Sequence, residues 1–196
     1  MAATSARGAA LVDVVAALAL VVIVAGIAVP VVGGTLERER TIVGGQYLAG
    51  VVRRARMEAL RRSVVVAVRV EVVDERAGFR LYADGNGNGV LQRDIDRRLD
   101  WPLTPPDWLD HHARGVSFRI NQPVPDISGT GWLEAGGDAV RLGRTALLAF
   151  SPLGSATSGT LYVAAAGGPQ MAVRVTGATG RVRLLIFDAQ SRQWAP

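Results

Sequence analysis

The sequence predicts an α+β protein in which a long, hydrophobic N-terminal helix packs on a C-terminal, antiparallel β-rich domain. Three observations predict this fold class. Residues 8–30, GAALVDVVAALALVVIVAGIAVP, are almost wholly apolar. Residues 35–62 are polar overall but carry an apolar stripe at helical spacing. From Ser63 onward, short runs rich in β-branched residues alternate with Gly- and Pro-containing turns, as in antiparallel strands.

The apolar stretch follows a short leader whose only charged side chain is Arg7. At ~1.5 Å rise per residue, residues 9–30 as a helix are about 33 Å long, which matches a bilayer core of ~30 Å. Asp13 lies in the first turn, where an ionised carboxylate is costly in lipid. This stretch fits three interpretations. It is a secretory signal peptide interrupted by Asp13, a plain single-span anchor, or a helix in which Asp13 has a function.

The second half of the helix is expected to be amphipathic over residues 31–62. Its apolar stripe follows i, i+3, i+4, i+7 and i+11 spacing and comprises Leu48, Val51, Val52, Ala55 and Ala59. Arginines lie mainly on the flanks and the outer side. Two glycine pairs, residues 33–34 and 44–45, each lower helix stability by up to ~1 kcal/mol per Gly, which predicts bends or local melting there.

Residues 63–73 predict a strand, with residues 79–83 as its hairpin partner. The loop that follows has Asp84, Asn86 and Asn88 at alternate positions, and Gly89 comes next, as in the first half of an EF-hand-type calcium loop. The second half does not match, because Ile95 occupies the position of the bidentate Glu. Such a mixture of Asp, Asn and Gly also suits an Asx-rich turn, so both interpretations stay open.

The rest of the chain predicts one short strand and then a β meander. Prolines in residues 100–126 indicate an irregular segment around a strand at 115–120. His111 and His112, the only histidines, are expected to be solvated loop residues. Pro-Gly, Ser-Gly and Gly turns separate strands within residues 145–166, 170–176 and 181–187, and this spacing is typical of a meander.

Composition limits the functional classes. The chain has 196 residues, a formal charge of +5 and no cysteine, so disulfides and thiolate chemistry are excluded. We expect no enzyme and no cofactor other than the candidate Ca²⁺, because neither a nucleophile elbow nor a Walker loop is present. A basic chain is compatible with nucleic-acid contact. The candidates for DNA contact are Arg174, Arg181, Arg183 and Arg192, although Arg181 and Arg183 also fit a solvated sheet face.

The N-terminus resembles the signal of type IV prepilins and type II secretion pseudopilins: a leader, Gly8, four mostly apolar residues, an acid and an apolar helix. The resemblance implies that a prepilin peptidase cuts between Gly8 and Ala9 and that the new terminus is methylated. Asp13 then becomes the fifth residue of the mature chain and Pro30 the twenty-second. The family has an assembly acid and often a kinking proline there, which implies roles for both in filament assembly. Ala9 and Asp13 replace the usual Phe and Glu.

The C-terminal third resembles the GspH/FimT branch of this family. The shared phrase is F-S-P-x-G…S-G-T-L-Y-V…V-x-x-T-G-R-V-R, and its positions here are Phe150, Pro152, Gly154, Ser158, Gly159, Gly180 and Arg181. The helical segment YLAGVVRRARMEALRR also resembles this branch, with a generic amphipathic helix as the alternative. The Asp-x-Asn-x-Asn-Gly loop is similar to one that such proteins often carry.

The resemblance implies a leader (1–8), a helix (9–62, of which 9–30 span the membrane) and a GspH-like domain (63–196). It implies a minor pseudopilin in the tip complex of the type II secretion pseudopilus, held in the inner membrane by a single span with its C-terminal domain in the periplasm. The implied partners are other pseudopilins and the prepilin peptidase. The alternatives are a FimT-like type IV minor pilin that acts in pilus assembly or DNA uptake, and a calcium-stabilised periplasmic domain on a plain anchor.

Overall fold

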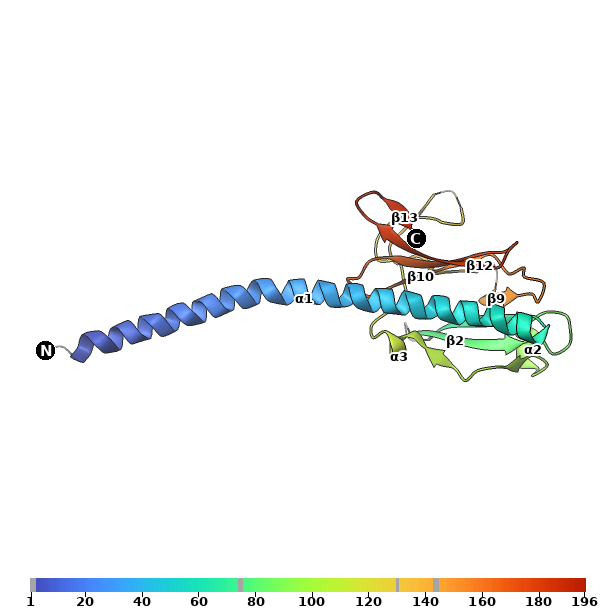
Figure 1. Ribbon diagram of the computed structural model, residues 1–196, viewed down its shortest axis with the longest axis horizontal. Coiled ribbons are helices and arrows are strands. Elements are labelled where there is room, and N and C mark those ends of the chain that lie inside the picture. Colours follow the sequence, from blue (N-terminus) through green and yellow to red (C-terminus); the bar gives the residue numbers. More distant parts are fainter. Residues whose placement is uncertain (1–2, 74–75, 130, 143–144) are drawn as a thin grey trace. The chain divides into compact units, whose positions relative to one another are not determined.

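The computed structural model describes residues 3–73, 76–129, 131–142 and 145–196, with their side chains except those of 3–10, 26–32 and 72–73. One long helix, α1 (Ala3–Arg62), precedes a series of short strands, and the paired strands are antiparallel (Figure 1). The predicted α+β class is therefore confirmed. The chain divides into two compact units, one that ends at Leu36 and one that comprises Glu37–Pro196.

The first unit is helical throughout its described part. Every residue from 11 to 25 is exposed, and the apolar side chains from Leu11 to Val24 are 56–70% accessible. Asp13 is among these exposed residues. Gly8, Ala9 and Pro30 fall within α1, but their side chains lie outside the described part of the structure. Within the described residues, no helical segment combines the length and hydropathy that a membrane span requires.

The first sheet contains the predicted hairpin. In this hairpin β1 (Val66–Val73) pairs with β2 (Arg76–Ala83), and Val66 lies opposite Ala83. The sheet order is β3-β2-β1-β9, with β3 at Trp101–Pro102 and β9 at Leu147–Phe150, and β4 (Asp107–Trp108) also pairs with β2. Two short helices lie in the connections, α2 (Gln92–Asp96) before β3 and α3 (Leu109–His112) after β4.

The second sheet has the order β13-β12-β11-β10-β5. Its main strands are β10 (Gly159–Ala164), β11 (Met171–Thr176), β12 (Arg181–Asp188) and β13 (Gln193–Ala195). At its other edge, β5 (Ser117–Phe118) and β8 (Val140–Arg141) both pair with β10. A separate pair is formed by β6 (Val124–Pro125) and β7 (Trp132–Leu133).

The meander prediction is right for β10 to β12 but wrong for β9. This strand pairs with β1, opposite Val66 to Arg69, and so belongs to the first sheet. Residues 151–158 then carry the chain to the second sheet, where β10 begins at Gly159. Turn spacing predicts that a strand exists, but it does not determine the partner with which that strand pairs.

The main core lies where the C-terminal half of α1 packs against both sheets (Figure 1). The predicted stripe supplies this face: Leu48, Val52, Ala55 and Ala59 are fully buried and Val51 is half-buried. They meet Val68 and Leu81 of the first sheet and Leu161 and Val173 of the second. A smaller core on the opposite face of the second sheet joins Tyr162 and Phe187 to the segment around β6 and β7.

Helix α1 continues without interruption through both glycine pairs, so the predicted local melting is wrong. At residues 44–45 the reason is close packing. A Cβ on Gly44 would lie 2.8 Å from a methyl of Val116, and one on Gly45 would lie 3.0 Å from the sulfur of Met171. The absent side chains let α1 approach β11 and the segment before β5 closely, and the packing gained there offsets the low helix propensity of glycine.

Candidate functional site

Four arginines lie on one face of the second sheet and form the arginine row: Arg141, Arg174, Arg181 and Arg183. Arg141 of β8 is opposite Thr160 of β10, Thr160 is opposite Arg174 of β11, and Arg174 is opposite Arg183 of β12. Residues directly opposite each other on neighbouring antiparallel strands project from the same face. Arg181 shares this face because it is two residues from Arg183.

The arginine row lies on the face of the sheet turned away from α1. Residues that alternate with it, such as Leu161, Val173 and Val175, are buried in the main core against the helix. Arg181 and Arg183 are exposed, and Arg141 and Arg174 are half-buried. Within the described residues, only Arg141 of the four has an ion-pair partner, Asp126 at 3.3 Å. Like charges on facing strands destabilise a sheet, and Arg174 lies directly opposite Arg183.

A cavity of about 390 Å³ opens at the Arg141 end of the row. Its described lining residues are Ser128, Asp138, Arg141, Ser158, Gly159 and Arg174. One guanidinium nitrogen of Arg174 donates a hydrogen bond to the Thr160 hydroxyl at 3.0 Å, which holds that side chain across the strand. Burial alone would raise the pKa of Asp126, but hydrogen bonds from Ser128 and the charge of Arg141 hold it below its usual value. Asp126 is therefore an anion that fixes Arg141.

Three of the four predicted DNA-contact residues, Arg174, Arg181 and Arg183, thus come together, and the fourth does not join them. Arg192 instead lies over the ring of Trp132, 4.6 Å from its centroid. Arg141 completes the row and was not predicted. Its only signal was the apolar-polar alternation around residue 140, which marks a strand but does not indicate its neighbours.

The residues of the GspH/FimT-like phrase make structural contacts between two turns. Phe150 is fully buried in the main core, and Pro152 begins the turn after β9. Gly154 and Gly180 both have positive φ, and a Cβ on Gly180 would lie 2.6 Å from the Gly154 carbonyl oxygen. The Ser158 hydroxyl accepts a hydrogen bond from the backbone N–H of Gly177 at 2.9 Å. These contacts fasten the crossover between the sheets to the β11–β12 turn.

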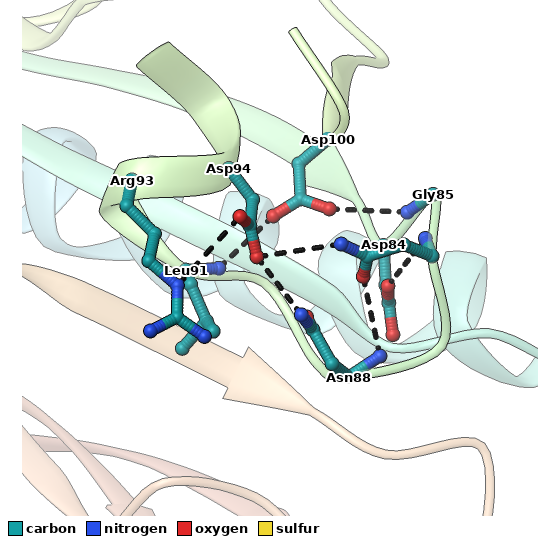
Figure 2. Close-up of polar contacts among 8 residues, drawn as sticks. Asp84, Gly85, Asn88, Leu91, Arg93, Asp94 and Asp100 are labelled. Atoms are coloured by element: carbon teal, nitrogen blue, oxygen red, sulfur yellow. Dashed lines mark hydrogen bonds and ion pairs between the residues drawn. The ribbon is translucent and has the colours of Figure 1, made fainter. Parts of the chain in front are cut away.

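The predicted calcium loop is closed by its own hydrogen bonds (Figure 2). The carboxylate of Asp84 accepts hydrogen bonds from the backbone N–H groups of Asn86, Gly87 and Gly89. One oxygen of the Asp94 carboxylate accepts hydrogen bonds from the side-chain amides of Asn86 and Asn88, at 3.4 and 3.0 Å. These contacts correspond to the Asx-rich turn.

Asp100 closes the base of the same loop. It is 1% exposed, and its two oxygens accept hydrogen bonds from the backbone N–H groups of Gly85 and Leu91 at 3.1 and 3.0 Å. Figure 2 shows the carboxylates of Asp94 and Asp100 directed toward the loop. Across the described ranges, no group of three or more His, Cys, Asp or Glu side chains has the geometry to hold a metal ion.

A second polar cluster joins α1 to the segment around α3. The Tyr47 hydroxyl donates a hydrogen bond to Asp107 at 2.6 Å, and Nε2 of His112 lies 3.0 and 3.1 Å from the two oxygens of that carboxylate. The His112 ring also stacks on Tyr47, with centroids 3.7 Å apart. His111 and His112 are both exposed, as predicted, but they lie in the short helix α3 rather than in a loop, and His112 also contacts Tyr47 and Asp107.

Burial and the adjacent Asp107 raise the pKa of Tyr47 to about 12. Burial opposes ionisation of Asp107, but hydrogen bonds from Tyr47, His112 and a backbone N–H still hold its pKa below the usual value. A cavity of about 290 Å³ beside this cluster is lined mainly by apolar side chains of β2 and the loop before β4. The cluster thus links α1 to the segment that contains β4 and α3.

No protein-family model, curated protein or solved structure matches the chain significantly.

Proposed function

We propose that the chain is a structural subunit of a pilin-type filament, as a minor pseudopilin in the tip complex of a type II secretion pseudopilus. The observation that carries this proposal is the exposed apolar surface of α1. From Leu11 to Val24, the large apolar side chains are exposed in the described part of the chain. A helix that is apolar all round requires lipid or other subunits to cover it.

In this proposal the apolar helix has two successive environments. The inner membrane holds the subunit before assembly, and the helices of neighbouring pseudopilins surround it in the filament. Asp13 then faces the terminal amine of a neighbouring subunit, because opposite charges in an apolar medium reduce each other's desolvation cost. The β-rich second unit has its own core, which supports a role as a domain presented in the periplasm. The role is structural rather than enzymatic.

Processing of the N-terminus tests this proposal. The full chain is co-expressed with a prepilin peptidase, extracted from membranes and examined by intact mass and N-terminal sequencing. We expect a chain that starts at Ala9 and carries one extra methyl group. The variant Gly8→Val should stay uncut, as should the wild type without the peptidase. A wild-type chain that stays uncut, or that is cut beyond Pro30, would exclude the pseudopilin assignment.

The arginine row favours a second candidate function, DNA capture by a FimT-like minor pilin. Within the described residues Arg174, Arg181 and Arg183 have no acidic partner, so their charges are available to phosphates. Binding through phosphate contacts weakens steeply as salt rises, because condensed counterions are released. A pseudopilin without this role has no need of the row.

The salt dependence of DNA binding separates the two candidates. For duplex DNA, the logarithm of affinity should fall linearly with the logarithm of salt concentration, and Arg183→Gln should reduce the slope by about 1. Arg97→Gln is the matched control, because it removes an exposed charge beside α2, in the connection between β2 and β3 of the first sheet. If the two variants have equal slopes of log affinity against log salt concentration, the arginine row is only a solvated face of the sheet. The secretion role would then be the one candidate left.

A further inference from the structure

The cavity at the Arg141 end of the arginine row differs from the rest of the row in shape. Arg181 and Arg183 project from an open sheet face, whereas Arg141 and Arg174 line a hollow of about 390 Å³. Small-molecule sites usually have a volume of about 300–1,000 Å³. The hollow therefore has room for one small chemical group of a ligand and for part of the ligand that carries this group.

Both arginines of the cavity are held in place by the protein. Arg174 is oriented by the hydroxyl of Thr160, an uncharged partner that leaves its positive charge unneutralised. Arg141 is oriented by Asp126, whose side chain is only 9% exposed and is also bonded by Ser128. Pre-organised side chains lose little conformational entropy when a ligand binds, so this arrangement favours binding.

One hydroxyl donor of the cavity has no acceptor among the described residues. The Ser158 oxygen already accepts a hydrogen bond from Gly177, which leaves its proton free to donate.

The donors also indicate the class of ligand. Among the described lining residues, two guanidinium groups from different strands and the hydroxyls of Ser128 and Ser158 surround the cavity. The one acid among them is Asp138, whose carboxylate accepts a hydrogen bond from the backbone N–H of Val140. Donors spread over several directions suit a tetrahedral oxyanion better than a planar carboxylate, and arginine forks bind phosphate strongly.

We propose that this cavity is a binding site for a phosphate group, held by Arg141, Arg174 and the Ser158 hydroxyl. The phosphate has two possible sources. It belongs to a nucleic-acid backbone, or it is a free phosphate ion or the phosphate of a small molecule. For the nucleic-acid source, the inference rests on the DNA-capture role proposed above. The cavity would then anchor one phosphate while Arg181 and Arg183 contact its neighbours.

The test compares two probes on the full chain in detergent. Inorganic phosphate is titrated by calorimetry, and a short labelled duplex DNA is followed by fluorescence anisotropy. Arg141→Gln and Arg174→Gln should each weaken phosphate binding about tenfold or more, as expected for loss of a charge-assisted hydrogen bond. Arg97→Gln, the matched charge control, should bind as the wild type does. Arg174→Lys should fall between, because it keeps the charge but loses the fork.

The outcomes separate the two proposals. Phosphate binding that requires both arginines supports the site, and if DNA does not bind, the nucleic-acid source and the DNA-capture role fail together. DNA binding without phosphate binding overturns the site and leaves DNA capture standing. Phosphate binding that neither variant weakens also overturns it. If Arg141→Gln unfolds because Asp126 loses its partner, circular dichroism will show this, and Arg174→Gln decides the question.

Discussion

At the scale of single residues, the contact among Tyr47, Asp107 and His112 fastens α1 to the segment around α3. The Tyr47 hydroxyl is 2.6 Å from the Asp107 carboxylate, and burial of the phenol raises its pKa to about 12. An unfolded tyrosine titrates near 10. The neutral phenol is therefore favoured by folding, and its contribution to stability is complete below pH ~10 and is lost as pH rises toward 12.

We predict that Tyr47→Phe lowers the free energy of unfolding at pH 7 by about 1–2 kcal/mol, the low end for a hydrogen bond to a charged acceptor at a half-exposed site. It should also remove the loss of stability between pH 10 and 12. Urea denaturation at a series of pH values measures both effects. Tyr82→Phe is the matched control, because no hydrogen bond of the Tyr82 hydroxyl is found among the described residues. Equal alkaline loss in both variants would contradict the prediction.

The depressed pKa of Asp107 has the opposite pH dependence. Despite burial, hydrogen bonds from Tyr47 and His112 lower its pKa below the usual value. The ionised carboxylate is thus favoured by folding, and its contribution is present above pH ~4, where an unfolded Asp has ionised. It is lost as pH falls through the lower, folded pKa. Asp107→Asn should therefore flatten the acid side of the same pH series.

Buried Asp100 permits a second prediction at this scale. Asp100→Ala leaves the N–H groups of Gly85 and Leu91 without their acceptor, so we expect a loss of about 2–3 kcal/mol. Asp96→Ala, at an exposed position of α2, should cost less than about 1 kcal/mol.

Added Ca²⁺ should leave the melting temperature of the wild type unchanged, because N–H donors occupy the loop carboxylates. A calcium-dependent rise that Asp84→Asn abolishes would instead support the EF-hand interpretation.

At the scale of elements, helix α1 offers the same substitution in two environments. Gly44 packs against Val116 and Ala113, whereas nothing lies within 4 Å of a Cβ built on Gly50. We predict that Gly44→Ala destabilises the second unit by about 1–3 kcal/mol through overpacking. Gly50→Ala should stabilise it by up to ~1 kcal/mol through helix propensity. Thermal unfolding of the two variants measures the difference. A gain of stability in both would mean that the segment between α3 and β5 shifts to admit the methyl group.

The elements that local patterns determine were predictable from the sequence, and their long-range partners were not. The period of the apolar residues placed the helix stripe and the β1–β2 hairpin correctly. The turn at 177–180 sets Thr176 opposite Arg181 and hence Arg174 opposite Arg183, so this half of the arginine row could have been predicted. Three features depend on segments that are far apart in the sequence: the partner of β9, the position of Arg141 and the Tyr47–His112 contact. The alternation of apolar and polar residues carries no information about such distant partners.

At the scale of the whole molecule, the two units differ in what covers their apolar side chains. Among the described residues, the main core draws on α1 from Ile42 onward, and the rest of it comes from the two sheets and from connecting segments such as α3, which supplies Leu109. Thr41 marks where this packing begins. Its buried hydroxyl donates a hydrogen bond to the Glu37 carbonyl oxygen and accepts one from the backbone N–H of Ala165. Among the described residues before Glu37, the large apolar side chains from Leu11 to Val24 are exposed.

This division predicts that a fragment comprising Glu37–Pro196 folds alone and stays monomeric, whereas the full chain associates unless detergent covers its helix. The melting temperature of the fragment should lie within about 4 °C of that of the full chain in detergent, because a larger shift means about 1 kcal/mol or more of lost packing. Light scattering after size exclusion measures association, and calorimetry measures the melting temperature.

Leu18→Lys with Val22→Lys in the full chain should reduce association without changing the melting temperature. If the fragment is unfolded, the apolar helix supports the fold and is not reserved for assembly. If the double variant associates as strongly as the wild type, the second unit carries the contact, and the filament proposal loses the observation on which it depends.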